Sequence, residues 1–320
     1  MTNWEQAEIF AVCSLSNIGR LGRGELIKVS ECVICGAAVS AGKRAMVAPF
    51  LARRIWQRET FPVELSHCAN CDFEFYNPRL ELTEEMKLYH DYRESEYQKS
   101  RQETEPWYSE AFNKGLADEK RWTGRTGALG PVVKQALTGR KVASVLDFGG
   151  DRGELVDKLF PDAERFVYDI SGVEPVAGVT ALRSEEECKQ RGFDVIVTSN
   201  LLEHVGFPLE LMARINAIAA PNTLVLHDVP LESSLSAPMV ARRVVQFGVL
   251  GVTRPKVAKS LMHGGWLRVM HEHVNYFSLK ALNEMMRRAG WNVLSSGIYR
   301  IGAAPLGQPM LWNLSERAAV

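Results

Sequence analysis

The feature that most constrains the fold is an alternation of short apolar runs and helical patterns that begins near residue 140. The runs are rich in Val, Ile, Leu and Phe, and helical spacing of apolar residues appears between them. Such alternation predicts βαβ units and therefore a mostly parallel sheet covered by helices, an α/β fold. The expected strands and helices are Val142–Phe148, Glu154–Phe160, Arg165–Ile170, Val179–Leu182, Asp194–Thr198, Leu209–Ala219 and Thr223–His227.

A capped helix and two further strands are expected near the C-terminal end. Phe277–Gly290 has a Ser at its second position that can cap a helix, and a Gly at its end that can terminate one. Its apolar residues recur on one face, as in a helix that packs on a sheet. Trp291–Ser295 and Pro309–Leu314 are the expected strands that follow.

A glycine-containing loop, Val-Leu-Asp-Phe-Gly-Gly-Asp-Arg-Gly-Glu of residues 145–154, follows the first expected strand and opens a helix. Glycines let the backbone approach a ligand closely, and the free amides of the next helix face that ligand. The acid inside the loop suits an amino group better than a phosphate, which disfavours a nicotinamide dinucleotide. The alternative is an ordinary strand-to-helix turn. The expected cofactor contacts are Asp147, Gly149, Gly150, Asp151 and Gly153.

A second acid at the end of the next strand supports a nucleoside ligand. Asp169 lies 22 positions after Asp147, and an acid at roughly this spacing can accept both ribose hydroxyls of an adenosine group. Glu174 is a competing candidate that lies past the expected strand end. Alternatively, Asp169 caps a turn.

The glycine loop resembles motif I of the class I S-adenosylmethionine-dependent methyltransferases, Asp-x-Gly-x-Gly-x-Gly, although Asp151 stands where the middle glycine is usual. Residues 193–208, Phe-Asp-Val-Ile-Val-Thr-Ser-Asn-Leu-Leu-Glu-His-Val-Gly-Phe-Pro, resemble the fourth strand and following turn of that family. The resemblance implies a Rossmann-like sheet with an antiparallel last strand, and S-adenosylmethionine as cofactor. It also implies that Ser199, Asn200 and Leu201 lie near the cofactor.

Four of the six cysteines form two Cys-x-x-Cys pairs, with 32 residues between the pairs. Each pair can offer two thiolates to one tetrahedral zinc ion, and no export signal favours disulfides instead. Four thiolates close the coordination shell, so we expect a structural zinc ion and no ligand role for His67. The alternative is four reduced thiols without a metal. The expected ligands are Cys32, Cys35, Cys68 and Cys71, which leaves Cys13 and Cys188 outside the site.

The stretch that starts at Cys71 and ends in Asn-Pro-Arg resembles a subgroup of methyltransferases with an N-terminal zinc-binding module, among them the sugar C-methyltransferases. In that group a tyrosine-bearing helix follows and covers the active site. The matching region here, residues 81–101, carries Tyr89, Tyr92 and Tyr97, and Tyr92 is a candidate catalytic residue. The alternative is ordinary packing of half-buried tyrosines.

A cluster of ionisable residues stands before the C-terminal helix, in Met-His-Glu-His-Val-Asn-Tyr-Phe-Ser of residues 270–278. It resembles a stretch of the sugar C-methyltransferases, which have a tyrosine at its first position and use one of its histidines as an acid–base residue. That histidine maps onto His273, and Glu272 matches as well. Because histidine accepts a proton near neutral pH, His273 is our first candidate for the base, followed by His271 and His204. For each histidine, a hydrogen-bonded structural role is the alternative.

The sequence argues against a catalytic metal ion. In some class I relatives, an acid and a histidine after the fourth strand bind a divalent ion together with an upstream acid and a later histidine. Glu203 and His204 match the pair, but Asn200 stands where the upstream acid would be.

The charges balance over the whole chain but not within its C-terminal part. The 38 basic and 38 acidic side chains give no net charge, which argues against binding of nucleic acid by bulk charge. Residues 241–300, however, hold ten Lys and Arg against two Glu. Basic residues there would suit a phosphate, such as the diphosphate of a nucleotide sugar, or an RNA backbone; the alternative is a solvated face. They concentrate in Arg242, Arg243, Arg254, Lys256, Lys259 and Arg268.

The chain therefore divides into four expected parts. These are a loose extension over residues 1–30, a zinc-binding module over 31–77, a helical linker or lid over 78–135, and an S-adenosylmethionine-binding methyltransferase domain over 136–320. No run of 18 apolar residues is present, so we expect no membrane span and a cytoplasmic protein.

The resemblance predicts methyl transfer to a small-molecule acceptor, for which a sugar or a nucleotide-linked sugar is our first expectation. The sugar C-methyltransferases have a further C-terminal domain, whereas this chain stops near its last expected strand. This difference favours O-methylation or another acceptor, although the choice between carbon and oxygen stays open. A second alternative is an RNA methyltransferase whose zinc module binds nucleic acid, although that module lacks an obvious basic and aromatic track. A third is a non-catalytic scaffold that binds S-adenosylmethionine.

Overall fold

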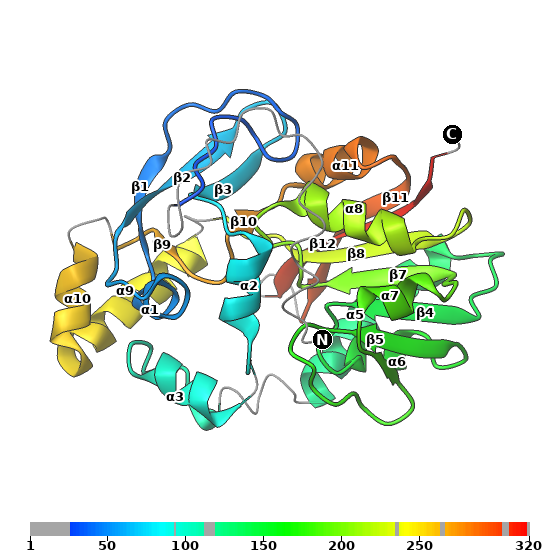
Figure 1. Cartoon of the computed structure of the whole chain (residues 1–320), viewed down its shortest axis with the longest axis horizontal. Coiled ribbons are helices and arrows are strands. Elements are labelled where there is room, and N and C mark those ends of the chain that lie inside the picture. The colour runs from blue at the N-terminus through cyan, green and yellow to red at the C-terminus, as the bar shows by residue number, and fades with distance from the viewer. Residues whose placement is uncertain are drawn as a thin grey trace.

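The computed structural model describes residues 26–92, 94–111, 119–233, 237–262, 266–302 and 307–318 (Figure 1). Most of the expected extension over residues 1–30 lies outside these ranges, as does Cys13. Two sheets dominate the described part, and the C-terminal half of the chain contributes strands to both of them.

The larger sheet has seven strands. In spatial order they are β11 (Trp291–Ile301), β12 (Gln308–Arg317), β8 (Leu224–Pro230), β7 (Val195–Ser199), β4 (Ser144–Phe148), β5 (Glu164–Tyr168) and β6 (Thr180–Leu182). The five strands from β8 to β6 pair in parallel. β12 pairs antiparallel with both β8 and β11, so it runs against the other six. The predicted mostly parallel sheet with an antiparallel last strand is confirmed.

Helices cover both faces of this sheet, so its central strands are buried on both sides. Along β4, Val145 packs with α5 and α6 on one face, whereas Leu146 packs with α8 and α11 on the other. The predicted strand and helix positions agree with the structure to within a few residues, except that β11 continues beyond Ser295. The helices are α5 (Glu119–Ala136), α6 (Glu154–Leu159), α7 (Glu185–Lys189), α8 (Pro208–Ile218) and α11 (Leu279–Arg288).

Local sequence sets both ends of α11. The Ser278 hydroxyl accepts a hydrogen bond from the Ala281 amide at 3.0 Å, a cap that contributes about 1 kcal/mol. Gly290 follows the helix with a φ of 83°, a left-handed conformation that glycine adopts without strain. Between these ends, Met285 and Met286 are fully buried against the sheet.

The smaller sheet has five strands and joins distant parts of the chain. β1 (Lys43–Val47), β2 (Pro62–Cys68) and β3 (Phe73–Asn77) form an antiparallel meander. Both edge strands come from the C-terminal half of the chain. β9 (Val269–Met270) pairs parallel with β1, and β10 (Asn275–Tyr276) pairs antiparallel with β3. The segment between β9 and β10 carries the predicted histidine cluster, which therefore lies across the end of this sheet.

The other described helices share one core with the strands of the smaller sheet, and α2 lies between the two sheets in Figure 1. They are α1 (Pro49–Trp56), α2 (Leu82–Tyr89), α3 (Ser95–Gln102), α9 (Ala237–Thr253) and α10 (Pro255–Met262). Within the described ranges, none of the helices combines the length and the apolar character needed to cross a membrane. The division of the chain at residues 30, 77 and 135 stays a prediction.

Candidate functional site

The four predicted zinc ligands meet at one point. Cys32 Sγ lies 3.6 Å from Cys71 Sγ, Cys35 Sγ lies 3.4 Å from Cys68 Sγ, and all four sulfurs lie within 4.8 Å of one another. Thiolates bound at about 2.3 Å to a tetrahedral zinc ion are roughly 3.8 Å apart, so the arrangement fits one zinc ion. The four side chains are buried in the same core as α8 and α11. His67 is half exposed and lies outside the cluster, as predicted.

The glycine loop connects β4 to α6 at the carboxyl end of the larger sheet. Gly149 and Gly153 have φ values of 72° and 76°, a conformation that suits glycine. Asp151, which replaces the usual middle glycine, has a φ of 55°, which Asp tolerates better than most residues. A Cβ added at Gly150 would lie 2.1 Å from Cγ of Asp147, so the loop passes directly over this carboxyl group.

Asp147 is a buried acid with unmet hydrogen-bonding capacity. It is 1% exposed, and its Oδ1 has no hydrogen-bond partner in the described part of the chain. Burial, together with the nearby charge of Asp169, raises the pKa of Asp147 to about 8. A positively charged ligand above the loop would satisfy this carboxyl group.

Asp169, the predicted ribose ligand, lies against the glycine loop. Its Oδ2 accepts a hydrogen bond from the Asp151 amide at 2.8 Å, and its Oδ1 accepts from the amide and hydroxyl of Ser171 at 2.9 and 2.6 Å. The carboxylate of the competing candidate, Glu174, is largely exposed and pairs with Arg183 at 3.0 Å. Of the two acids, Asp169 is the one whose carboxylate contacts the loop, and its oxygens retain lone pairs for ligand hydroxyls.

A buried ion pair at the same edge of the sheet was not predicted. Arg125 on α5 donates to Asp228 on β8 at 2.9 Å from Nε and to Asn200 Oδ1 at 2.9 Å from Nη2. Asp228 also accepts from Tyr299 at 2.7 Å and from Ser199 at 3.2 Å. The network thus fixes two predicted neighbours of the cofactor, Ser199 and Asn200. Its one sequence signal is an acid directly after the expected strand Thr223–His227.

The turn after β7 connects the glycine loop to the histidine cluster. At its start, Leu201 is so close to Gly149 that an added Cβ there would lie 2.8 Å from Leu201 Cδ2. Three residues later, the ring of His204 packs edge-on against His273, with 4.8 Å between ring centroids. The two backbone amides after His273 donate to the carbonyl of Glu203 at 2.8 and 3.1 Å, which holds the two segments together.

Glu203, His204 and His273, called here the acid–histidine cluster, place three potential ligand atoms within 4.8 Å of one another. Glu203 is 1% exposed, and neither of its carboxylate oxygens has a hydrogen-bond partner among the described residues. His204 Nδ1 is hydrogen-bonded to Tyr89 Oη at 2.7 Å. His273 Nδ1 is hydrogen-bonded to Glu232 Oε2 at 2.7 Å.

The three members of the acid–histidine cluster differ in charge. Burial raises the pKa of Glu203 to about 7, although His273 opposes the rise. Burial, reinforced by His273, lowers the pKa of His204 to about 3. Burial also opposes a charge on His273, but the hydrogen bond and charge of Glu232 outweigh it and raise the pKa of His273 to about 9. The positive charge of the cluster therefore lies on His273.

The other two residues of the predicted catalytic stretch are held by ion pairs from α3 and the segment after it. Glu272 accepts a hydrogen bond from Arg101 at 2.6 Å, and Arg101 also donates to Glu105 at 2.8 Å. Glu105 in turn accepts from His271 Nδ1 at 3.1 Å, while Arg243 donates to His271 Nε2. Because both ring nitrogens of His271 have partners, the geometry favours a positioning role. A catalytic role for His271 or Glu272 stays a prediction.

The tyrosines of the predicted lid contact both the turn after β7 and the predicted catalytic stretch. Tyr89 contacts His204 from the end of α2, and Tyr97 donates to Glu272 at 2.7 Å from α3. Tyr92 packs between these two tyrosines, with its ring centroid 5.9 Å from that of Tyr89 and 5.3 Å from that of Tyr97. The catalytic role of Tyr92 stays a prediction.

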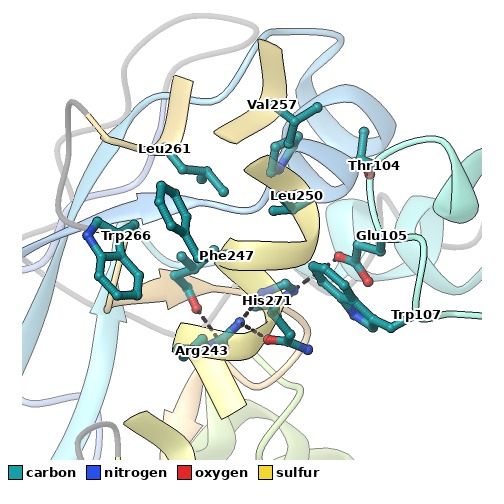
Figure 2. Close-up of a pocket in the computed structure, with 13 residues that line it drawn as sticks. Thr104, Glu105, Trp107, Arg243, Phe247, Leu250, Val257, Leu261, Trp266 and His271 are labelled. Carbon is teal, nitrogen blue, oxygen red and sulfur yellow. Dashed lines mark hydrogen bonds and ion pairs between the residues drawn. The ribbon is translucent and has the colours of Figure 1, made fainter. Parts of the chain in front are cut away.

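A pocket beside His271 is bounded by α9, α10 and the segment after α3 (Figure 2). Trp107, Phe247 and Trp266 line it, and the last two rings stack with centroids 4.6 Å apart. Of the predicted basic residues, Arg243 lines the pocket. The others lie outside its lining: Arg242, Arg254, Lys256, Lys259 and Arg268.

One buried arginine joins the smaller sheet to the turn after β7. Arg79, from the Asn-Pro-Arg segment, is 1% exposed and donates to the carbonyls of Tyr76, Gly206 and Val274 at 2.8, 2.8 and 3.2 Å. The approach is so close that a Cβ added at Gly206 would lie 1.8 Å from a backbone oxygen of the segment after β3. The motif was visible in the sequence, but the role of its arginine was not.

Comparison with known proteins gives one family match and several similar solved structures. A sequence profile described as a methyltransferase domain matches residues 121–296. A search of curated proteins gives no match. The structure of Burkholderia thailandensis 1,6-didemethyltoxoflavin-N1-methyltransferase shares 16% identity, covering 79% of this chain and 99% of that chain, with a TM-score of 0.45. Mitomycin 7-O-methyltransferase shares 15% identity, covering 69% and 60% of the two chains, with a TM-score of 0.41. Human N-acetylserotonin methyltransferase shares 12% identity, covering 74% and 56%, with a TM-score of 0.39.

The profile covers more than half of the chain, from α5 into β11. It therefore includes the glycine loop, the turn after β7 and the acid–histidine cluster. The seven-stranded sheet, with its one reversed strand, is the sheet that the resemblance to methyltransferases implied. The chain belongs to the methyltransferase-domain family and is a class I S-adenosylmethionine-dependent methyltransferase.

Proposed function

We propose that this enzyme methylates a small-molecule acceptor and that the acceptor is a sugar or a nucleotide-linked sugar. One observation carries the proposal. A single turn contacts the glycine loop through Leu201 and the histidine cluster through His204. This turn therefore brings a cofactor at the loop and a proton acceptor at His273 into one site, and methyl transfer requires its partners to be held together in this way.

The cofactor would lie across the carboxyl edge of the larger sheet. Asp147 and the loop that passes over it suit the positively charged end of the cofactor, and Asp169 suits its ribose hydroxyls. S-adenosylmethionine, when bound, supplies an electrophilic methyl group on a sulfonium sulfur. The remaining proposed contacts are Gly149, Gly150, Asp151, Gly153, Ser199, Asn200 and Leu201.

His273 is the proposed base. Glu232 holds its Nδ1, which leaves Nε2 to accept the proton of the acceptor. A positive charge nearby, such as that of a sulfonium, favours the neutral imidazole that this step needs. As the acceptor oxygen or carbon bonds to the methyl carbon, the sulfur–carbon bond breaks, its electron pair stays on sulfur, and the proton passes to His273. Glu272, His271 and Tyr92 complete the proposed catalytic set.

The cysteine cluster is proposed to hold a structural zinc ion. Four thiolates would leave no open coordination position, so the ion would stabilise the fold without taking part in the reaction. Since the cysteines pack in the core shared with α8 and α11, the ion would fasten the smaller sheet to the larger one.

The pocket in Figure 2 is the proposed site for the part of the acceptor remote from the reacting atom. Its aromatic walls offer flat apolar faces to a ring system. Arg243, which lines the pocket, carries a charge that suits a phosphate. These features support a nucleotide-linked sugar over a free sugar.

A screen with labelled S-adenosylmethionine tests the acceptor class. Nucleotide sugars, free sugars and RNA are offered to the full chain, and we expect label in the nucleotide-sugar fraction. Analysis of the product then distinguishes a methyl ether from a new carbon–carbon bond. Label in RNA alone would overturn the proposal in favour of the RNA methyltransferase.

Two variants test the residue roles. We expect His273→Gln to keep its calorimetric affinity for S-adenosylmethionine but to lose roughly 10²–10⁴-fold in turnover, the usual contribution of a general base. We expect Asp169→Ala to weaken cofactor binding, with Glu174→Ala as the matched control. If Asp169→Ala and Glu174→Ala bind S-adenosylmethionine equally well, Asp169 is not the ribose ligand.

A further inference from the structure

We propose that the acid–histidine cluster, Glu203, His204 and His273, binds a divalent transition-metal cation. The cation would have three protein ligands and at least one coordination position left for the acceptor. The sequence argued against such an ion because Asn200 stands where an upstream acid would be. In the structure Asn200 is hydrogen-bonded to Arg125, and the three residues of the cluster form a ligand set without it.

The spacing of the ligand atoms fits one ion. The three atoms lie within 4.8 Å of one another, and His204 Nε2 already lies 3.8 Å from Glu203 Oε1. Ligand atoms about 2.1 Å from a shared ion are roughly 3 to 4 Å apart. A contraction of at most about 1–2 Å, within the reach of side-chain rotation, would complete the site.

The buried, unpaired carboxylate of Glu203 indicates that a ligand binds here. Its side chain is 2% exposed, and within the described chain neither carboxylate oxygen has a hydrogen-bond partner. An unpaired buried carboxylate is costly, and proteins compensate such groups by pairing or by metal coordination. The described side chains nearest to it in the cluster are the two histidines, so a cation held among all three would pair the carboxylate.

The outer contacts of both histidines are those of metal ligands. His273 Nδ1 is bonded to the Glu232 carboxylate at 2.7 Å. His204 Nδ1 lies 2.7 Å from Tyr89 Oη and 3.1 Å from the carbonyl oxygen of Glu272. Metal-binding histidines usually bond their second ring nitrogen to a carboxylate, a carbonyl or water, which fixes the ring and leaves the other nitrogen for the ion.

The donor set selects the class of ion. Two imidazoles and one carboxylate suit zinc, iron(II) or cobalt(II), whereas magnesium and calcium prefer oxygen ligands. A hydroxyl group bound at the open position would lose its proton more readily. In the metal-bound enzyme His273 Nε2 would bind the ion and could not also accept the proton, so the ion would replace His273 in activating the acceptor. This last step rests on the proposed function, but binding of the cation does not.

Cobalt(II) titration of the full chain, loaded with one zinc ion per chain at the cysteine cluster, tests the site. Calorimetry and the visible d–d absorption of cobalt report binding, and a zinc indicator reports any exchange at the cysteine cluster. We expect one cobalt ion per chain to bind without release of zinc. Absence of a cobalt signal at high micromolar concentration, with the zinc retained, would overturn the proposal. Because no methyl acceptor is needed, this outcome is distinct from failure of the proposed function.

Variants decide which residues bind the ion. Glu203→Gln keeps the shape of the side chain, and we expect it to weaken cobalt binding by at least about 100-fold while thermal stability is kept or increased. His273→Gln should have a similar effect on affinity. The controls are Glu316→Gln and His90→Gln, whose side chains are exposed and lie outside both clusters. Undiminished affinity in Glu203→Gln and His273→Gln would show that cobalt binds elsewhere.

Discussion

The cysteine cluster and the acid–histidine cluster are built in opposite ways. Each Cys-x-x-Cys pair sits within a tight local turn, so two short stretches supply all four sulfurs. In the second cluster, His273 stands 69 positions after His204 and meets it through backbone contacts between two distant segments. Local spacing therefore reveals the first site in the sequence, whereas the second site exists only after the two sheets have packed.

The largest expected effect comes from removing a thiolate. Cys68→Ser takes one of four ligands from the proposed zinc ion, whose binding contributes on the order of 10 kcal/mol in small zinc modules. We expect the zinc content to fall from about one ion per chain to near zero, and the smaller sheet to unfold. Metal analysis and circular dichroism measure both. Cys188→Ala, which changes a buried cysteine outside the cluster, is the control and should keep its zinc.

Arg79→Met should affect the acid–histidine cluster but not the cysteine cluster. It removes hydrogen bonds to the buried carbonyls of Tyr76, Gly206 and Val274, each worth about 1 kcal/mol or more, so we expect a total loss of about 3 kcal/mol or more in urea unfolding. The cysteines do not depend on this side chain, so zinc should remain while cobalt binding at the acid–histidine cluster is lost. Arg140→Met, at an exposed pair with Glu316, should cost less than about 1 kcal/mol. Equal losses in the two variants would contradict the role assigned to Arg79.

Asp147→Asn tests whether the buried carboxyl group under the glycine loop, like that of Glu203, is compensated by a bound cation. Folding raises the pKa of Asp147 from 3.8 to about 8, so the native state holds this proton more tightly than the unfolded chain. Its contribution to stability is therefore lost as the pH rises from 3.8 to 8. One pKa unit corresponds to about 1.4 kcal/mol. The rise from 3.8 to about 8 corresponds to at most roughly 6 kcal/mol, so we expect the variant to be several kcal/mol more stable than the wild type at pH 8, with little difference at pH 4.

The same Asp147→Asn variant should bind S-adenosylmethionine more weakly, because the carboxyl group faces the positive end of the cofactor in the proposed complex. Urea unfolding at two pH values and calorimetry measure the two effects. A parallel loss of stability at both pH values would show that the carboxyl group is already paired in the free enzyme.

The smallest expected effect is that of Tyr89→Phe. The change removes one hydroxyl group from His204 Nδ1 and leaves the ring in place. Loss of such an outer contact lowers metal affinity by about 10-fold or more, so cobalt binding should weaken by about that factor while zinc is unaffected. Unchanged cobalt affinity would mean that the carbonyl of Glu272 alone orients this histidine.

The sequence predicted what depends on local spacing. The strands of the larger sheet were found because each is a compact apolar run, and Asp151 takes the left-handed conformation expected of a residue in the place of a glycine. β9 and β10 were missed because strands of two residues carry no periodicity. Arg79, Arg125 and Asp228 were missed as buried groups because charged residues are expected at the surface unless their partners are known. Those partners are distant in the chain and were not visible.

The edge strands of the smaller sheet have a consequence for synthesis of the protein. The 191 residues between Asn77 of β3 and Val269 of β9 take roughly 10 to 40 s to translate at about 5–20 residues per second. During this interval β1, β2 and β3 have emerged, but both outer strands of the meander lack their neighbours, and open edges of this kind pair readily with other chains. A ribosome that stalls in this interval would hold a nascent chain with two unpaired edges, which a chaperone would need to protect until the histidine segment arrives.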